Sequence, residues 1–151
     1  MIKSAGILLY RQHAGTEVFL VHPGGPFFAR KDAGSWTIPK GEYTADEEAL
    51  AAACREFMEE TGQAIKGPFI ALTPVQQKGG KLVTAWAVEG DINADHIVSN
   101  NFELTWPPNS GKKKTFPEID RAAWFTLAEA RQKINERQAA LLVELEKLLQ
   151  H

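Results

Sequence analysis

Three segments of this chain are apolar on both faces of an extended strand, and this feature restricts the fold more than any other. They are residues 4–11, 17–22 and 81–88. A strand with one solvated face alternates apolar and polar residues, whereas a strand covered on both faces does not. We therefore expect an α/β fold in which a mixed β-sheet lies between layers of helices.

Turn residues between the apolar segments predict how the strands connect. The polar turn at 12–15 predicts a hairpin between the first two strands, and Lys78-Gly79-Gly80 predicts a second hairpin that ends in the 81–88 strand. Residues 89–101 are mostly polar and predict a connection, and residues 107–114 predict a basic loop. The further strands expected from the pattern are 68–76, 102–106 and 121–125.

Two helices are expected at the carboxyl end of the chain. Thr126 and Glu129 have the spacing of a capping box and predict a short helix to about residue 134. A leucine stripe over 139–149 predicts a terminal amphipathic helix. Such a stripe is typical of core packing, and a dimer contact is the alternative, so we expect a monomer or a homodimer.

The bulk properties exclude several classes of protein. A length of 151 residues suits one domain spanning 1–151, and a formal charge of −2 argues against general nucleic-acid binding. The single cysteine, Cys54, excludes an intrachain disulfide and indicates a reducing compartment. The apolar run near the amino end is too short for a signal peptide or a membrane span, so we expect a cytoplasmic protein with no membrane partner.

An acidic helix is expected between Gly41 and Gly62. Its carboxylates Glu56, Glu59 and Glu60 have i, i+3 and i+4 spacing, which places them on one face. Repulsion costs such a helix about 0.2–0.5 kcal/mol per pair, and a bound cation would reverse the sign of that contribution. The alternative is a solvated acidic face without a ligand.

Local signals set the expected limits and packing of this helix. Thr44 and Glu47 predict a capping box, with residues 46–48 in the first turn, and Gly62 predicts a left-handed C-cap. The stripe expected to be buried consists of Leu50, Ala53, Cys54, Phe57 and Thr61.

The spacing of the fixed residues between Gly41 and Gly62 resembles a known signature. It is Gly41, five residues, Glu47, seven residues and then Arg55-Glu56-Phe57-Met58-Glu59-Glu60-Thr61-Gly62. This resembles the Nudix hydrolase signature G-x5-E-x7-R-E-U-x-E-E-x-G-U, in which U is a bulky apolar residue. The last position departs from it, because Gln63 stands where an aliphatic residue is expected.

The resemblance implies an α/β/α sandwich and a metal-dependent site. Mg²⁺, with Mn²⁺ as a substitute, would be bound by Glu56, Glu59, Glu60 and the backbone carbonyl at Gly41, with Glu47 as a support. Arg55 is expected to support the carboxylates through ion pairs, since Glu59 is its i+4 neighbour. Many members of the family carry a further glutamate before a final strand with a tryptophan, as Glu118 precedes Trp124 here. Glu118 is thus expected to be a metal ligand or the general base; otherwise it is a solvated loop residue, and one of the helix glutamates would be the general base.

The lead into the signature, Trp36-Thr37-Ile38-Pro39-Lys40-Gly41, looks like that of Nudix members acting on diadenosine polyphosphates or diphosphoinositol phosphates. Lys40 is therefore a candidate phosphate contact, whereas Trp36 is expected in the core. Arg30, in the loop before it, could bind substrate phosphates or be a solvated turn residue. Lys112, Lys113 and Lys114 could steer a polyphosphate toward the site.

The predicted function is Mg²⁺-dependent hydrolysis of a phosphoanhydride bond in a nucleoside diphosphate linked to another group. The small-molecule substrate is a nucleotide or another diphosphate compound, and dinucleoside polyphosphates are favoured. The alternatives are a nucleoside triphosphate pyrophosphohydrolase, a non-catalytic nucleotide-binding sensor and an α/β interaction module that binds no metal.

Overall fold

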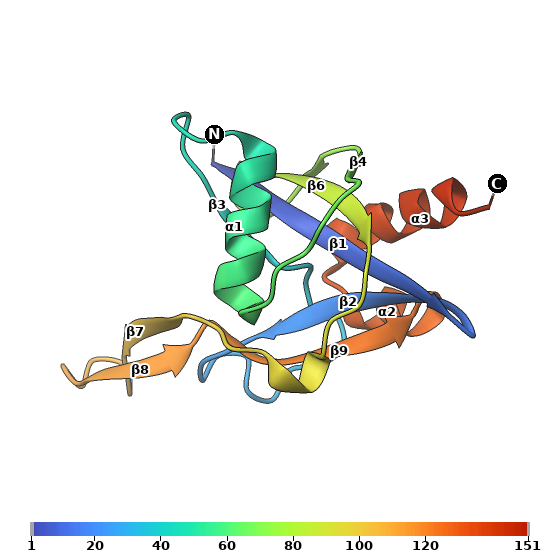
Figure 1. Cartoon of the computed structure of the whole chain (residues 1–151). Coiled ribbons are helices and arrows are strands. Elements are labelled where there is room, and N and C mark those ends of the chain that lie inside the picture. Colours follow the sequence, from blue (N-terminus) through green and yellow to red (C-terminus); the bar gives the residue numbers. More distant parts are fainter. Residues whose placement is uncertain (1, 151) are drawn as a thin grey trace.

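The computed structural model describes residues 2–150, which form a mixed β-sheet between helices (Figure 1). The strands are β1 (Lys3–His13), β2 (Gly15–Pro23), β3 (Lys40–Glu42), β4 (Ile70–Ala71), β5 (Val75–Gln76), β6 (Leu82–Glu89), β7 (Asn101–Thr105), β8 (Lys113–Pro117) and β9 (Ile119–Thr126). The helices are α1 (Ala49–Thr61), α2 (Leu127–Lys133) and α3 (Ala139–Leu148), with short 3₁₀ turns η1 (Lys78–Gly80), η2 (Ala94–His96) and η3 (Glu136–Gln138).

Strand β1 is the centre of the main sheet, whose order is β4-β6-β1-β2-β9. It runs parallel to β6 and antiparallel to β2, so the sheet is mixed, as the sequence predicted. The short strand β3 pairs with the first half of β1, where Gly41 lies opposite Ala5. This pairing places the turn before α1 directly beside the middle of the sheet.

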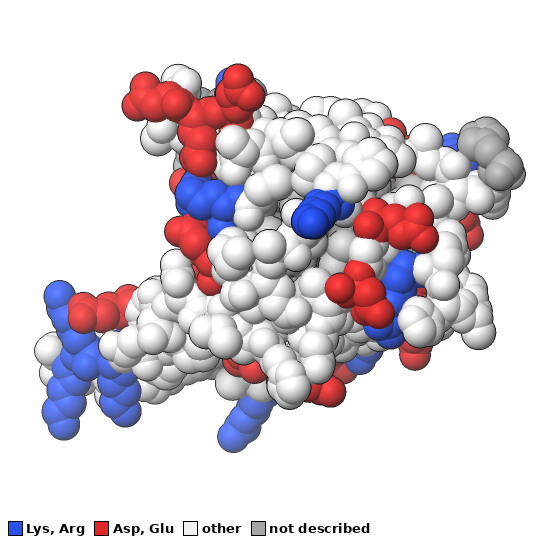
Figure 2. All heavy atoms as spheres, in the orientation of Figure 1, with Lys and Arg blue, Asp and Glu red and all other residues white. Residues whose placement is uncertain are grey.

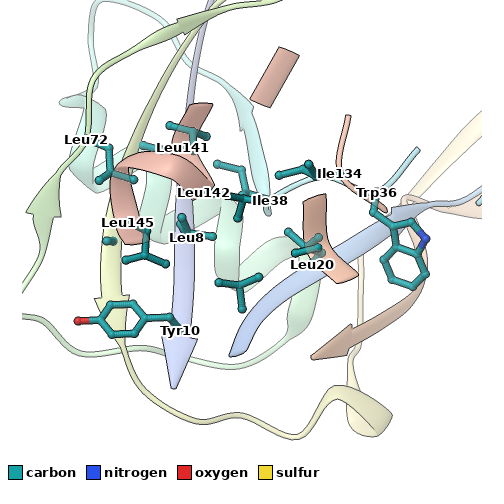
Figure 3. Packing of buried hydrophobic residues seen from close by; sticks show 14 of the residues in the cluster. Leu8, Tyr10, Leu20, Trp36, Ile38, Leu72, Ile134, Leu141, Leu142 and Leu145 are labelled. Carbon is teal, nitrogen blue, oxygen red and sulfur yellow. The ribbon is translucent and has the colours of Figure 1, made fainter. Parts of the chain in front are cut away.

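Each face of the sheet has its own buried core, as expected for strands that are apolar on both sides. Ile7 and Leu9 of β1 pack with Phe57 of α1 on one face. Leu8 of β1 lies on the other face, in the cluster that α2 and α3 cover (Figure 3). Burying one such side chain stabilises the fold by about 1.5–3 kcal/mol. The architecture is therefore a sheet between helical layers.

The edge of the sheet differs from the prediction in one place. The segment 68–76 was expected to be one strand, but it forms two short strands, β4 and β5, on either side of an interruption. Pro74 lies in the interruption and has no N–H to donate to β6. The preceding Thr73 N–H donates at 2.8 Å to the Glu144 carboxylate of α3 and not to a strand.

The segment between β6 and β9 departs further from the prediction. Residues 107–114 were expected to be a loop, but Lys113 and Lys114 pair with Thr105 and Leu104 in a second, two-stranded sheet of β7 and β8. Figure 1 shows this hairpin projecting from the body of the protein beneath the carboxyl end of α1. The turn-forming and charged residues of this segment predicted a loop, but its last residues form part of β8 because they pair with β7.

The helix ends confirm two of the three predicted caps. Thr126 and Glu129 form the expected capping box at the start of α2. Gly62 has a φ of 75°, and its N–H donates to the Met58 carbonyl at 2.7 Å, so α1 ends in a left-handed cap. Within residues 2–150, no helix is long and apolar enough to cross a membrane.

Candidate active site

The start of α1 was predicted wrongly, and the reason lies in the site itself. The helix begins at Ala49 with Glu48 at the N-cap, so residues 46–48 precede the first turn. Glu47 turns its carboxylate to Arg55, accepting from Nε at 2.8 Å and from Nη2 at 3.0 Å, and not to the backbone of Thr44. A bidentate bond between two charged groups is stronger than the single bond that the Glu47 carboxylate would accept from a backbone N–H in a capping box.

The buried stripe of α1 is also shifted from the predicted one. Ala53, Phe57 and Thr61 are buried as expected, whereas Leu50 and Cys54 are only half-buried. The helix is rotated toward β3, so that Ala52 and Glu60 are buried as well. Burial raises the pKa of the Cys54 thiol, which favours the unreactive protonated form.

Arg55 connects three carboxylates on the exposed side of α1. Besides Glu47, its Nη1 donates to Glu56 at 2.9 Å and to Glu59 at 2.6 Å, so the predicted i, i+4 pair is present. The hydrogen bonds that the guanidinium donates to Glu47, and then to Glu56, raise its pKa, while burial opposes this shift. Figure 2 shows acidic and basic side chains side by side along this edge. Arg55 thus fixes two candidate metal ligands and offsets their mutual repulsion.

Glu60 points away from this exposed edge and is buried, with only 7% of its surface accessible. Burial raises its pKa to about 8; the nearby Lys40 charge opposes this shift, and Glu56 and Glu118 add to it. Burial also lowers the pKa of the Lys40 ammonium, with Lys81 contributing in the same direction. Without a bound cation, Glu60 is therefore largely protonated at neutral pH, and its carboxyl group accepts a hydrogen bond from the backbone N–H of Lys40.

Gly41 brings the backbone of β3 against the carboxyl group of Glu56. A Cβ atom at position 41 would lie 2.0 Å from both Cδ and Oε2 of Glu56, so any other residue here would displace the Glu56 carboxyl group. Burial is the largest cause of the raised pKa of Glu56; the Arg55 hydrogen bond opposes it, and Glu59 and Glu118 add to it. The predicted ligand pair Gly41 and Glu56 is thus brought together.

Glu118 joins the helix carboxylates from a distant part of the chain. Its N–H donates to the Asn100 carbonyl at 2.8 Å, and its own carbonyl accepts from Gly24 N–H at 2.8 Å. Asn100 N–H in turn donates to the Glu59 carbonyl at 2.9 Å. Burial, and then the Glu59 charge, raise the pKa of Glu118. The loop residue predicted from family resemblance therefore lies at the carboxylate cluster.

The donor set fits a hard divalent cation, although the side chains are not gathered around one point. No group of three His, Cys, Asp or Glu side chains within residues 2–150 could hold a metal ion as it stands. Arg55 explains this, because it draws Glu56 and Glu59 toward its own N–H groups. The Glu56 carboxyl group lies against the Gly41 backbone, and Glu56 and Glu60 both have raised pKa values, so a bound Mg²⁺ would stabilise their ionised forms.

The other charged residues considered from the sequence lie apart from this cluster. Arg30 is exposed in the turn after β2 and forms no side-chain hydrogen bond or ion pair with residues 2–150, and Lys112–Lys114 are exposed at the hairpin end. His22 is structural: it is fully buried and contacts Asp120 Oδ1 at 2.8 Å and the Lys31 carbonyl at 2.7 Å. Trp36 is in the core, as expected.

The sequence did not reveal the segment that locks Glu118 in place. Ser99 Oγ accepts from the Ile119 N–H at 3.2 Å, and Asn100 links Glu118 to α1 through its backbone. Gln63, the departure from the signature, exchanges hydrogen bonds with the Asn93 backbone at 3.0 and 3.2 Å. These contacts use backbone groups, which leave no spacing signal in the sequence.

Comparison with known proteins identifies the family that this fold and site define. The family model for the NUDIX domain matches residues 2–145, so the chain belongs to the Nudix family. No curated protein sequence matches the chain.

Solved structures share the fold at low sequence identity. A Caenorhabditis elegans Ap4A hydrolase in a binary complex is 24% identical, with a TM-score of 0.68 over 99% of this chain and 98% of that one. The Nudix domain of Shewanella oneidensis NrtR, crystallised with ADP ribose, is 14% identical, with a TM-score of 0.66 over 98% and 87%. RenU from M. smegmatis, a Nudix hydrolase, is 18% identical, with a TM-score of 0.64 over 99% and 88%.

Proposed function

We propose that this protein is a Mg²⁺-dependent hydrolase of phosphoanhydride bonds in which a nucleoside diphosphate is linked to another group. The observation that carries the proposal is the carboxylate cluster, in which Glu56 lies against the Gly41 backbone and Glu56, Glu60 and Glu118 all have raised pKa values. Buried carboxylates that repel one another destabilise the protein unless a cation or protons neutralise them. Their grouping therefore supports a cation-dependent role.

The residues divide into ligands and supports. Glu56, Glu59, Glu60 and the Gly41 carbonyl would hold Mg²⁺, or Mn²⁺ in its place. When bound there, the metal would neutralise phosphate charge and acidify a water molecule. Arg55 orients Glu56 and Glu59 through its hydrogen bonds, and Glu47 holds Arg55 in turn. Once Glu60 is ionised, Lys40 offers a positive charge to both this carboxylate and a substrate phosphate.

Glu118 is the proposed general base. It comes from a rigid turn, because backbone hydrogen bonds from Gly24 and to Asn100 fix it on both sides. Its pKa is raised by burial and by Glu59, which makes it a better proton acceptor than an exposed carboxylate. In the reaction Glu118 takes a proton from the attacking water, whose oxygen forms a new bond to phosphorus. The bond between that phosphorus and the bridging oxygen breaks, and the bridging oxygen leaves as part of the second phosphate fragment.

Dinucleoside polyphosphates are the preferred substrate class. The lead Trp36–Gly41 supports this choice, and the C. elegans protein of similar fold is an Ap4A hydrolase. The similar Nudix domain of NrtR was crystallised with ADP ribose, which is a nucleoside diphosphate linked to a sugar. Nucleoside triphosphates are the alternative substrates, and nucleotide binding without cleavage is the alternative function.

A substrate panel tests this proposal. Diadenosine polyphosphates, nucleoside triphosphates, nucleotide sugars and diphosphoinositol phosphates are incubated with and without Mg²⁺, and phosphate-containing products are measured. Glu59→Gln removes a ligand with little change in volume. Its matched control is Glu48→Gln, which makes the same change at an exposed residue, the N-cap of the same helix. Metal-dependent cleavage lost only in Glu59→Gln supports the hydrolase. Nucleotide binding without cleavage would leave the sensor function.

A further inference from the structure

The hairpin of β7 and β8 contributes no side chain to either buried core of the described chain. Its five residue pairs run from Asn101↔Pro117 at the base to Thr105↔Lys113 near the tip. An isolated two-stranded hairpin is only marginally stable in water. The side chains of this projecting hairpin therefore contribute little to the stability of the fold, which points to another role for them. In Figure 1 it extends from the side of the protein where α1 ends.

The base of the hairpin is the candidate active site. Glu118 follows β8 directly, and Asn100, which precedes β7, bonds to both Glu118 and Glu59 through its backbone. At about 3.4 Å per residue, Lys114 lies about 14 Å along the strand from Glu118. A substrate that reacts at the carboxylates and extends by several phosphates can therefore reach the hairpin.

One face of the hairpin is aromatic and is shared with the loop after β2. Phe102 and Phe116 form a cross-strand pair with ring centroids 6.0 Å apart. Trp106, just beyond β7, packs edge-to-face against Phe27 of the loop at 5.4 Å. Phe27 nevertheless leaves 58% of its surface exposed, so part of this ring is accessible to a ligand.

The same hairpin carries a net positive charge, because its three lysines outnumber its one acidic residue, Glu103. Lys112, Lys113 and Lys114 are exposed, and none of them forms an ion pair within the described part of the chain. Figure 2 shows these cations gathered at the end of the hairpin. Lys114 pairs with Leu104 and is two residues from Phe116, so it shares the aromatic face. Aromatic rings beside cations are the chemistry that binds a base and its phosphates.

We propose that the hairpin and the loop form a nucleotide-binding arm, consisting of Phe27, Phe102, Trp106, Phe116 and Lys114. The arm stacks the nucleobase that is farther from the reacting phosphorus and pairs Lys114 with an adjacent phosphate. This inference rests on the proposed hydrolase and adds the residues that set its specificity. A substrate with a second nucleoside would use the arm, whereas a base-free diphosphate would not.

Equilibrium binding of two probes tests the arm in the full chain. The first probe is a methylene-bridged, non-hydrolysable diadenosine polyphosphate, and the second is methylenediphosphonate, which has no base; both are titrated by calorimetry in Mg²⁺. Phe27→Ala removes the most exposed ring, Phe27→Tyr keeps an aromatic ring, and Val143→Ala is an exposed control on α3. Thermal unfolding of each variant reports whether the fold is intact.

We expect Phe27→Ala to lower the affinity for the diadenosine probe about tenfold, within the 5- to 150-fold range that base stacking contributes. The affinity for methylenediphosphonate should not change. Phe27→Tyr and Val143→Ala should bind both probes like the wild type. Lys114→Ala should weaken the diadenosine probe more at low salt than at high salt, whereas Lys147→Ala on α3 should not.

Two results would overturn the arm. One is unchanged affinity of Phe27→Ala for the diadenosine probe. The other is an equal loss of affinity for both probes together with a lowered Tm. That result would mean that the aromatic residues only stabilise the hairpin. The proposed function can fail separately. If no panel compound is cleaved but binding still depends on Phe27, the hydrolase proposal is wrong and the proposal of a nucleotide-binding arm stands.

Discussion

Replacing Glu60 with glutamine should stabilise the metal-free protein at alkaline pH while removing its activity. The carboxyl group is buried, and its pKa is raised from 4.5 to about 8. Between these values the native state holds a proton that the unfolded state has lost, so the free energy of unfolding falls as pH rises. Glutamine is similar in volume and does not ionise, and therefore has no such dependence.

The magnitude follows from the two pKa values. With 4.5 in the unfolded state and about 8 in the native state, the cost to wild-type stability is about 1.4 kcal/mol at pH 5.5 and about 4.6 kcal/mol at pH 8.5. The difference, about 3 kcal/mol, is the upper limit for the stability that Glu60→Gln gains over this pH range. Relaxation around an ionised Glu60 reduces it, so we expect about 1–3 kcal/mol, or about 2–4 °C in Tm per kcal/mol.

Thermal unfolding followed by circular dichroism in EDTA measures this effect at pH 5.5, 7.0 and 8.5. Glu48→Gln, at the exposed N-cap of the same helix, should have the same Tm as the wild type at every pH. Adding Mg²⁺ should raise the wild-type Tm more at pH 8.5 than at pH 5.5, because the ion competes with the proton, and should change Glu60→Gln little. A Glu60→Gln advantage that stays constant or shrinks as pH rises would refute the reasoning.

Three further variants separate chemistry from folding. Glu118→Gln should lower kcat about 10²–10⁴-fold with little change in KM, as expected for loss of a general base, and a wild-type rate in a steady-state assay would make it a surface residue. Gly41→Ala should abolish metal-dependent turnover, since its Cβ would lie 2.0 Å from the Glu56 carboxyl group; retained Mg²⁺ stabilisation in a melting assay would contradict this. Thr126→Ala should cost about 0.5–2 kcal/mol in urea unfolding by removing the α2 cap, with kcat unchanged, and a rate defect would argue against a purely structural role.

Periodic features of the sequence predicted the layers of the fold. The strands that are apolar on both faces required helices on both sides, and Ile7 and Leu8 indeed face different cores. The spacing from Gly41 to Gly62 predicted one helix face of carboxylates and the i, i+4 bond between Arg55 and Glu59. These inferences succeeded because side-chain direction in a helix or strand depends on local geometry alone.

Predictions failed where a local signal competed with a distant partner. The Thr44–Glu47 capping box does not form, because Glu47 accepts a bidentate bond from Arg55, which lies two turns along α1. The basic segment 107–114 looked like a loop, yet Lys113 and Lys114 enter a strand because β7 supplies a ladder. In both cases the competing partner is set by how the chain folds back and not by neighbouring residues.

The sequence by itself determined the family, the two-sided sheet and the acidic face of α1, because each follows from residue spacing along a regular element. Only the tertiary structure decided that Glu60 is buried beside Lys40, that Glu118 joins the cluster through Asn100, and that Phe27 meets Trp106 across the hairpin. The pKa of a carboxyl group and the shape of a binding surface depend on which distant segments displace water from them. That information is absent from local spacing and exists only once the sheet, the helix and the hairpin are packed together.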